Sequence, residues 1–87
     1  MSSLPLQPKL SRRFRLQYEE AQSRWVLLYP EGMVQLNRSA AEILKRCNGE
    51  QSIDAIVAEL EAAFHVQGIE ADVRNLLEEG KRRGWIE

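Results

Sequence analysis

A proline and a glycine separate two short apolar runs in the first half of the chain, and this arrangement constrains the fold more than any other feature of the sequence. The runs are 25–29 (WVLLY) and 33–36 (MVQL), and Pro30, Glu31 and Gly32 stand between them. Proline presets φ for the second position of a β-turn, and glycine can adopt a positive φ at the fourth. The spacing therefore predicts a β-hairpin whose second strand, 33–36, is short and lies at the edge of a sheet.

The strand 25–29 is apolar on both faces of its pleat, which is typical of a strand in the middle of a sheet with other elements packed against it. An earlier run, 14–18 (FRLQY), alternates strictly, with aromatic and leucine side chains on one face and arginine or glutamine on the other. We expect this run to pair with 25–29 through the polar connection EEAQSR. The sheet would then be a three-stranded antiparallel meander with the outer side of strand 33–36 exposed.

Three helical patterns follow the predicted strands. Their apolar stripes are Ala40, Ile43, Leu44 and Cys47, then Ile53, Ile56, Val57, Leu60 and Phe64, then Val73, Leu76 and Leu77. Asn37, or a capping box from Ser39 to Glu42, can start the first helix. Ser52 is the N-cap candidate of the second helix, and Gly68 marks the break before the third. The predicted fold class is therefore α+β, a three-stranded antiparallel β-meander followed by three α-helices, similar to winged-helix domains.

The length of 87 residues predicts one small domain. We expect residues 1–9 to form a flexible N-terminal arm, because two prolines deny it regular structure, and residues 10–87 to form the folded domain. At the C-terminus, Trp85 and Ile86 are expected to fold back onto the core. No apolar run approaches the roughly 20 residues that cross a bilayer, and the N-terminal residues lack the apolar stretch of a signal peptide, so we expect a cytoplasmic protein.

Residue types that commonly carry catalysis or metal binding are scarce. Cys47 is the single cysteine and falls on an apolar helix face, so we expect a buried, reduced and unreactive thiol. His65 is the single histidine, and no second histidine or cysteine stands at metal-ligand spacing. The GxSxG, HExxH and CxxC motifs and a phosphate-binding glycine loop are absent. We therefore expect no catalytic residue, no metal site and no cofactor, and a protein that is not an enzyme.

Charge is unevenly distributed along the chain. Residues 1–46 carry eight Lys/Arg and four acids, whereas residues 47–87 carry four Lys/Arg and nine acids, so the formal net charge of −1 combines +4 with −5. The simpler interpretation is that these charges keep a small domain soluble. The functional interpretation is that the basic, strand-bearing half, including Arg15, attracts an acidic peptide or partner.

Strands packed beside three short helices are also typical of winged-helix domains that bind nucleic acid. In this chain the segment 70–83 holds four acids and four bases, and the sequence pI is about 5.9. It therefore lacks the basic stripe that supplies most non-specific affinity for phosphate, and the strands precede the helices. Nucleic-acid binding is the weaker alternative.

The ordered set of motifs resembles one known family. The motifs are FRLQY, WVLLYPEG, LNRSAAEIL, NGEQS leading into IDAIVAEL, ADVRNLL and the terminal RRGWIE. From Leu10 onward they resemble PQQ synthesis protein D (PqqD), a family of small accessory proteins of pyrroloquinoline quinone (PQQ) biosynthesis. Two positions depart from the family pattern: Asn48 stands where an aspartate is usual, and Gly32 stands where a larger residue, often arginine, is common.

The resemblance implies a RiPP precursor recognition element, a domain that binds the leader of a ribosomally made precursor peptide and presents it to a modifying enzyme. The implied peptide is PqqA, and the implied enzyme is the radical-SAM protein PqqE, which crosslinks a glutamate and a tyrosine of that peptide. A recognition domain for another peptide-modifying enzyme is the main alternative. We expect a monomer, although an open edge also permits a strand-swapped or edge-paired dimer.

Edge-strand addition supplies a physical mechanism for this role. An extended peptide would add as a fourth strand along 33–36, and its apolar side chains would enter a groove between that strand and the third helix. The predicted peptide-binding residues are Met33, Val34, Gln35, Leu36, Val73, Arg74, Leu76 and Leu77. For the three apolar helix residues, plain core packing is the alternative.

Overall fold

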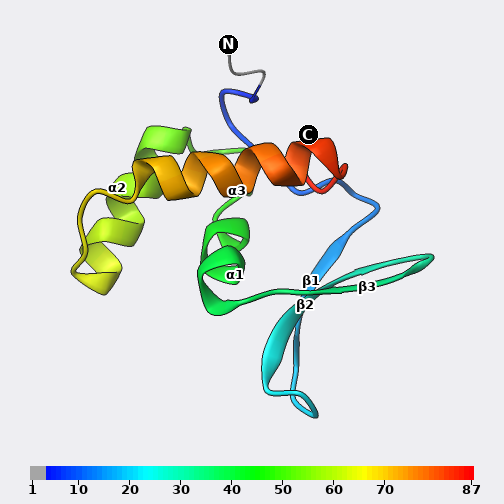
Figure 1. Ribbon diagram of the computed structural model, residues 1–87. Coiled ribbons are helices and arrows are strands. Elements are labelled where there is room, and N and C mark those ends of the chain that lie inside the picture. Colours follow the sequence, from blue (N-terminus) through cyan, green and yellow to red (C-terminus); the bar gives the residue numbers. More distant parts are fainter. Residues whose placement is uncertain (1–3) are drawn as a thin grey trace.

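An antiparallel sheet and three helices follow one another along the chain in the computed structural model, which describes residues 4–87 (Figure 1). The strands are β1 (Arg15–Glu19), β2 (Arg24–Tyr29) and β3 (Gly32–Gln35), in the spatial order β1-β2-β3. The helices are α1 (Arg38–Lys45), α2 (Ile53–Phe64) and α3 (Glu70–Arg82). The predicted α+β architecture, a three-stranded meander followed by three helices, is confirmed.

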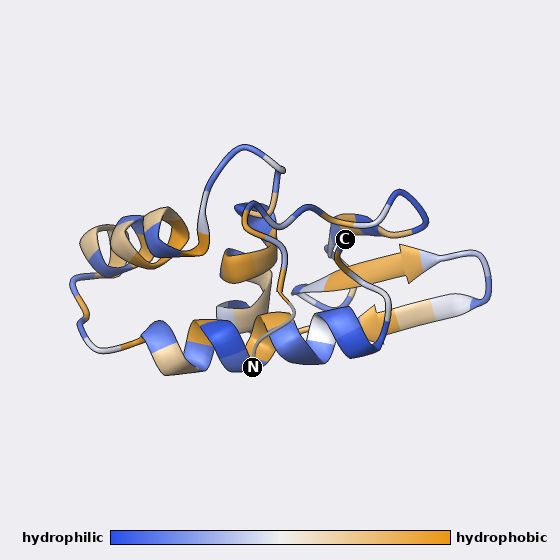
Figure 2. Ribbon diagram, turned by 90° about the horizontal axis from the view of Figure 1, so that it is seen from above, coloured by the Kyte–Doolittle hydropathy of each residue, from blue (hydrophilic) through white to orange (hydrophobic). Residues whose placement is uncertain are grey.

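Helix α1 packs directly on one face of the sheet, and α2 and α3 pack on α1, so that one core joins all three helices to that face. Leu27 of β2 pairs with Leu16 of β1 and with Val34 of β3, and this row of side chains faces the helices. Each helix contributes a fully buried side chain to the same core, and these are Leu44, Ile56 and Leu77. In Figure 2, hydrophobic residues interrupt the hydrophilic ones at helical spacing along α3. None of the helices within residues 4–87 has the length and apolar character needed to span a membrane.

The hairpin between β2 and β3 is a two-residue turn, because Tyr29 pairs with Gly32 and only Pro30 and Glu31 lie between them. Proline holds φ near −65°, so the turn cannot be one of the primed types that two-residue hairpins prefer. The positive φ that we expected to be available at Gly32 is not used. Gly32 instead permits close packing, since a Cβ there would lie 3.3 Å from the Tyr29 hydroxyl oxygen.

Side-chain caps start the first two helices where the sequence indicates. The Asn37 Oδ1 atom accepts a hydrogen bond from the Ala40 N–H at 2.8 Å, and the Ser52 Oγ atom accepts one from the Ala55 N–H at 3.1 Å. Each cap satisfies a main-chain donor that has no partner inside its helix. Helix α1 therefore starts directly after Asn37, and the alternative start at Ser39 is wrong.

The connection between α2 and α3 is fixed at both ends. Helix α2 ends at His65, which has a left-handed conformation with φ of 55°, three residues before the predicted break at Gly68. Ile69 provides no side-chain cap for α3. The Glu61 carboxylate replaces that cap, because its Oε2 atom accepts hydrogen bonds from the N–H groups of Gly68 at 2.9 Å and of Ile69 at 3.4 Å. The α2–α3 loop is thus tied back onto α2.

The two ends of the chain pair with each other. The Lys9 N–H donates to the Glu87 carbonyl at 3.1 Å, and the Glu87 N–H donates to the Lys9 carbonyl at 2.8 Å. Leu10 forms an isolated bridge with Ile86, and both Ile86 and Trp85 are buried as predicted. These contacts anchor the N-terminal segment against the C-terminus.

The predicted boundary of the N-terminal arm, at Lys9, lies inside this network. Pro8 is fully buried, and its carbonyl accepts a hydrogen bond from the Gly49 N–H at 3.0 Å. Pro8 and Lys9 therefore belong to the folded domain. Residues 1–3 lie outside the described residues, and the flexibility of the rest of the arm stays a prediction.

Candidate functional site

The outer edge of β3 is open. The Leu36 N–H donates to the Trp25 carbonyl at 3.0 Å, so these two residues form a hydrogen-bonded pair just beyond β3. Hydrogen-bonded and non-hydrogen-bonded pairs alternate along an antiparallel ladder, so the N–H and C=O groups of Val34 point toward β2. Those of Met33 and Gln35 point outward, and no main-chain group within residues 4–87 bonds to them. The edge on which the predicted mechanism depends is free in this part of the chain.

A groove of about 430 Å³ lies beside the end of β3. Its lining residues are Gln35, Leu36, Asn37, Ser39, Ala40, Ile43, Asp72, Asn75, Leu76, Glu79 and Trp85. The end of β3 provides one wall, α1 and Trp85 provide the floor, and α3 provides the opposite wall. In Figure 1, α3 lies above the end of β3 with α1 between them.

Helix α3 turns different faces toward the core and toward the groove. The core-facing residues are Val73, Leu77 and Gly80. The groove-facing residues, spaced i, i+3, i+4 and i+7, are Asp72, Asn75, Leu76 and Glu79. The groove-facing residues therefore precede the core-facing residues by one position along α3. Leu76 lies on the border between the groove face and the core face.

Of the four predicted strand residues, Gln35 and Leu36 line the groove, and Met33 and Val34 do not. The Met33 side chain lies on the sheet face away from the helices and is 43% exposed. Val34 is half-buried against the core. Leu36 is only 4% exposed, so most of its side chain already belongs to the core. The groove is thus centred on the last part of β3 rather than on its whole length.

Of the predicted apolar helix residues, only Leu76 lines the groove. Val73 and Leu77 are buried in the core, which is the alternative that the sequence left open. Direct contact between Leu77 and a peptide would require the core to open, because Leu77 has no exposed surface. The peptide contacts of the remaining predicted residues stay a prediction.

Arg74 does not line the groove either. Its Nε atom lies 2.9 Å from the Glu70 carboxylate, and its Nη2 atom lies 3.6 Å from the Asp54 carboxylate at the start of α2. Both contacts are on the side of α3 that meets α2. Arg74 therefore links two helices, and its predicted role as a polar contact in the groove is not supported by this geometry.

The charge lining the groove is acidic rather than basic. Asp72 and Glu79 are its only ionisable lining residues within the described chain, and Glu79 also pairs with Arg82 at 3.2 Å and Arg83 at 2.7 Å. Arg15, which we expected to help attract an acidic partner, lies on β1 with β2 between it and β3. Any attraction by Arg15 therefore acts at a distance, whereas Arg24 of β2 lies beside the groove and donates to the Gln35 side chain at 3.1 Å.

The floor of the groove contains residues outside the predicted site. Ser39 and Ala40 are small residues in the first turn of the helix that follows the edge strand directly, and that adjacency is the signal that could have identified them. Trp85 also lines the floor, and its main-chain N–H donates a hydrogen bond to the Gly80 carbonyl at 2.7 Å. A Cβ on Gly80 would lie 3.3 Å from the Trp85 ring, so the absence of a side chain lets the indole lie against α3.

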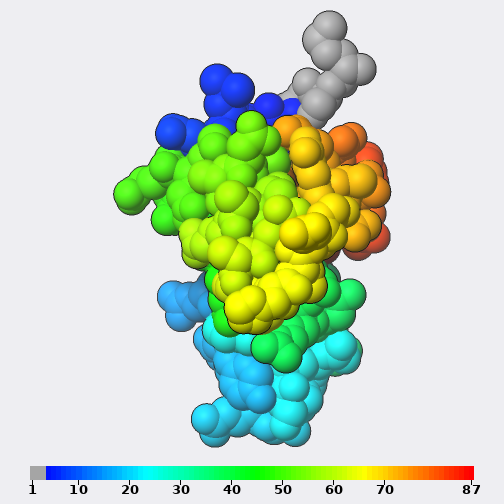
Figure 3. Space-filling view, turned by 90° about the vertical axis from the view of Figure 1, so that its left-hand side faces the viewer, coloured from blue at the N-terminus to red at the C-terminus, as the bar shows by residue number. Residues whose placement is uncertain are grey.

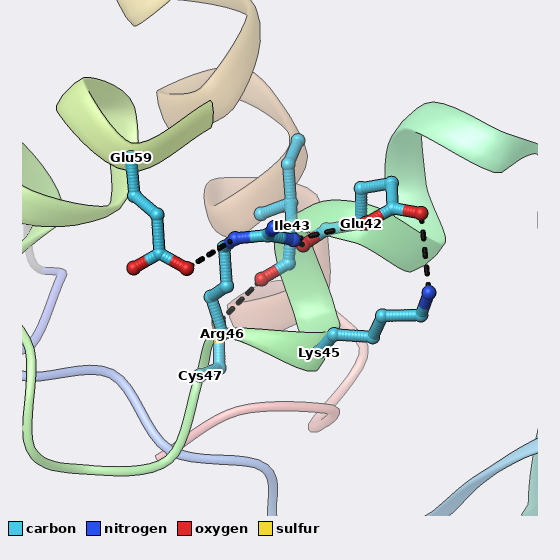
Figure 4. Close-up of polar contacts among 6 residues, drawn as sticks. All are labelled: Glu42, Ile43, Lys45, Arg46, Cys47 and Glu59. Atoms are coloured by element: carbon cyan, nitrogen blue, oxygen red, sulfur yellow. Dashed lines mark hydrogen bonds and ion pairs between the residues drawn. The ribbon is translucent and has the colours of Figure 1, made fainter. Parts of the chain in front are cut away.

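A network of ion pairs holds α1 in place beneath the groove (Figure 4). The Arg46 guanidinium donates to Glu42 at 2.9 Å and to Glu59 of α2 at 2.9 Å, and the Lys45 ammonium donates to Glu42 at 3.1 Å. Burial raises the pKa of Glu42, but the hydrogen bonds from Arg46 and Lys45 outweigh that effect, so the pKa lies below its usual value. The network joins the end of α1 to α2.

The single thiol of the chain is buried away from the groove. The Cys47 thiol is buried, donates to the Ile43 carbonyl at 3.4 Å, and has its pKa raised to about 12 by that burial. The thiol is thus protonated at neutral pH, and the predicted buried position is confirmed. Within residues 4–87, no group of three or more His, Cys, Asp or Glu side chains could hold a metal ion.

Comparison with known proteins identifies the family. The family model for "Coenzyme PQQ synthesis protein D (PqqD)" matches residues 24–86. The chain is 48% identical over 87 residues to a "PqqA binding protein" of Methylococcus capsulatus, and the match covers 95% of this chain and 94% of the relative. It is 56% identical over 81 residues to a "PqqA binding protein" of Azotobacter vinelandii, covering 92% of this chain and 88% of the relative.

A solved structure shares the fold. It is the solution NMR structure of the PqqD truncation of Methylobacterium extorquens PqqCD, described as a functional and stand-alone RiPP recognition element. The two structures match with a TM-score of 0.78 at 29% sequence identity, over 92% of this chain and 87% of the other. The sheet edge and groove described above therefore lie on a known recognition fold. This chain belongs to the PqqD family.

Proposed function

We propose that this chain binds the precursor peptide PqqA as an added strand along β3 and presents it to a modifying enzyme in PQQ biosynthesis. The observation that carries the proposal is the open edge of β3 beside a groove that α3 closes on its other side. Relatives at 48% and 56% identity are named PqqA binding proteins, and the matching solved structure is a RiPP recognition element. The protein is accordingly a binding protein and not an enzyme.

The geometry of the edge suits a single added strand. Met33 and Gln35 are two residues apart, so their N–H and C=O groups lie on the same side of β3 and repeat at about 7 Å. A peptide strand presents its own groups at the same repeat. Alternate peptide side chains would then point toward the helices, and those near Gln35 would enter the groove.

The lining of the groove favours a particular kind of side chain. Its floor and inner wall are apolar, formed by Ala40, Ile43, Leu76 and Trp85. Asp72 on α3 adds negative charge, whereas the two arginines paired with Glu79 offset the charge of that side chain. The groove therefore suits an apolar side chain with polar or basic neighbours. No basic side chain lines the groove within the described residues, which disfavours the nucleic-acid alternative.

We further propose that the enzyme is the radical-SAM protein PqqE, as the family resemblance implies, and that the chain works as a monomer in the cytoplasm. The crosslinking chemistry would belong to the enzyme, and this chain would supply binding and presentation. The alternative, a recognition domain for another peptide-modifying enzyme, would use the same edge and groove. A pull-down of this chain with each candidate enzyme, with and without peptide, separates the two.

Amide hydrogen exchange tests the binding mode. We expect PqqA to slow exchange at the N–H groups of Met33 and Gln35, because each would donate to the added strand. The register provides an internal control on the opposite edge, where the N–H groups of Leu16 and Tyr18 also point outward. Exchange there should not change. Protection at Leu16 and Tyr18 alone, or at neither edge, would refute strand addition at β3.

A further inference from the structure

We infer that a second, apolar pocket, which adjoins the groove between α1, α2 and the α2–α3 loop, takes one large apolar side chain of the same peptide. That side chain would lie beyond the segment paired with β3. The inference rests on the proposed function. It adds a second anchoring point that decides which peptides bind well.

The pocket has a volume of about 350 Å³. Its apolar lining consists of Ile43, Leu60, Phe64, Val66, Ile69 and Val73. A cavity of this size with apolar walls is large enough to bury one aliphatic or aromatic side chain. Figure 3 shows the loop after α2 (yellow) next to the start of α1 (green) on this face of the molecule.

Exposed apolar side chains gather at the mouth of this pocket. Phe64 is 37% exposed and Val66 is 41% exposed, and they are two of the five large hydrophobic residues that are exposed within residues 4–87. Single exposed apolar residues are ordinary, but a pair beside an apolar cavity is typical of a binding surface. Arg38 covers part of this surface, with its guanidinium carbon 5.5 Å from the centre of the Phe64 ring.

The pocket and the groove adjoin, which argues for one occupant. Both are lined by Ser39, Ile43 and Asp72, so these side chains stand between the two and belong to the wall of each. Helix α3 forms one wall of both, and the distance along it from Glu79 to Asp72 is about 10 Å at 1.5 Å per residue. An extended peptide covers that distance in about three residues. A peptide leaving the edge of β3 along α3 therefore arrives at the pocket.

The loop that roofs the pocket is already held in place. The Val66 N–H donates to the Glu61 carbonyl at 3.1 Å, and the Glu61 carboxylate bonds the N–H groups of Gly68 and Ile69. A preformed cavity loses less conformational entropy on binding than one that must be built. The charged lining residues of the pocket are Arg38, Glu42 and Asp72, and charged residues around an apolar interior are the usual arrangement at an anchoring pocket.

The test compares two neighbouring substitutions by calorimetry with synthetic PqqA. Val66→Glu places a charge in the pocket and is expected to raise the Kd about tenfold. Gln67→Glu adds the same charge on an exposed residue that does not line the pocket and should leave the Kd within twofold. Circular dichroism melts should show both variants folded, because both positions are exposed. Phe64→Ala is the second variant and should also weaken binding.

Shortened peptides locate the contact. As PqqA is trimmed from each end, the difference between the unmodified chain and Val66→Glu should vanish when one terminal segment is removed, while protection of Met33 and Gln35 persists. Equal affinity of Val66→Glu and the unmodified chain for full-length PqqA would overturn the pocket, as would equal weakening by Gln67→Glu. Gln35→Pro keeps the two proposals apart. If it weakens binding while Val66→Glu does not, strand addition stands without the pocket, and if neither weakens binding, both fail.

Discussion

Replacing Gln35 by proline removes one outward N–H from the edge of β3 and leaves the ladder between β2 and β3 intact. In this register Val34 and Leu36 form the hydrogen bonds with β2, whereas the N–H and C=O groups of Met33 and Gln35 point outward. Proline also restricts the residue before it to extended conformations, which Val34 already has. The folded chain should therefore tolerate Gln35→Pro.

The expected loss of affinity follows from the hydrogen bond that the peptide could no longer make. A typical intramolecular hydrogen bond contributes about 1 kcal/mol, and leaving the peptide carbonyl without a partner adds about 1–2 kcal/mol when the site is closed to water. Together these effects correspond to roughly a 30- to 140-fold increase in Kd. The proline ring would also stand where the peptide backbone approaches, which acts in the same direction.

Gln35→Ala is the matched control. The Gln35 side chain accepts a hydrogen bond from Arg24 at 3.1 Å and donates one to Gln22 at 2.8 Å, and both variants lose these contacts. Only the proline variant loses the N–H. The ratio of the two Kd values, measured by calorimetry with PqqA, therefore separates the effect of the lost N–H and of the proline ring at the edge from the effect of losing the side-chain contacts.

A second comparison tests the register itself. Val34→Pro removes an N–H that bonds to β2, so it should destabilise the fold by about 3 kcal/mol or more, whereas Gln35→Pro should cost about 1 kcal/mol. Urea unfolding measures both. If the two prolines destabilise equally, the assignment of outward groups is wrong. If Gln35→Pro is folded and binds PqqA as well as Gln35→Ala does, strand addition along β3 is refuted.

Three further predictions concern residues that the structure separates by role. Leu76→Ala should weaken PqqA binding about tenfold and cost less stability than Leu77→Ala, because Leu76 is half-buried, whereas Leu77→Ala should lower the free energy of unfolding by about 2–5 kcal/mol; calorimetry and urea unfolding distinguish them. Because the pKa of Glu42 is lowered in the folded state, its carboxylate contributes stability that is complete above the ordinary glutamate pKa and is lost as the pH falls through the folded-state pKa. Glu42→Gln should therefore make the melting temperature depend less on pH in the acid range. Arg15→Gln should slow PqqA association at low salt and leave dissociation unchanged in stopped-flow measurements, and an association rate that is insensitive to both salt and substitution would remove its attractive role.

Local sequence was sufficient for the elements and their order. The two-residue turn at Pro30 and Glu31 depends on the φ that proline imposes, and the starts of α1 and α2 depend on Asn37 and Ser52 side chains that reach an N–H three residues away. The buried position of Cys47 follows from helical periodicity. Such interactions join residues that are close in the chain, so the pattern alone predicts them.

The groove required the tertiary structure, because its walls come from segments about forty residues apart. Periodicity correctly placed Leu76 and Leu77 side by side on α3, but only packing decides that one lines the groove and the other lies in the core with no exposed surface. The sequence pattern assigns Arg74 to the groove. Its contact with Asp54 of α2 joins residues that are far apart in the chain, so local sequence does not reveal it. Trp85 was expected in the core, and the close approach of its ring to Gly80 makes it part of the floor as well. The sequence determined which surfaces each element offers, and the angles and distances between elements decided which of them meet.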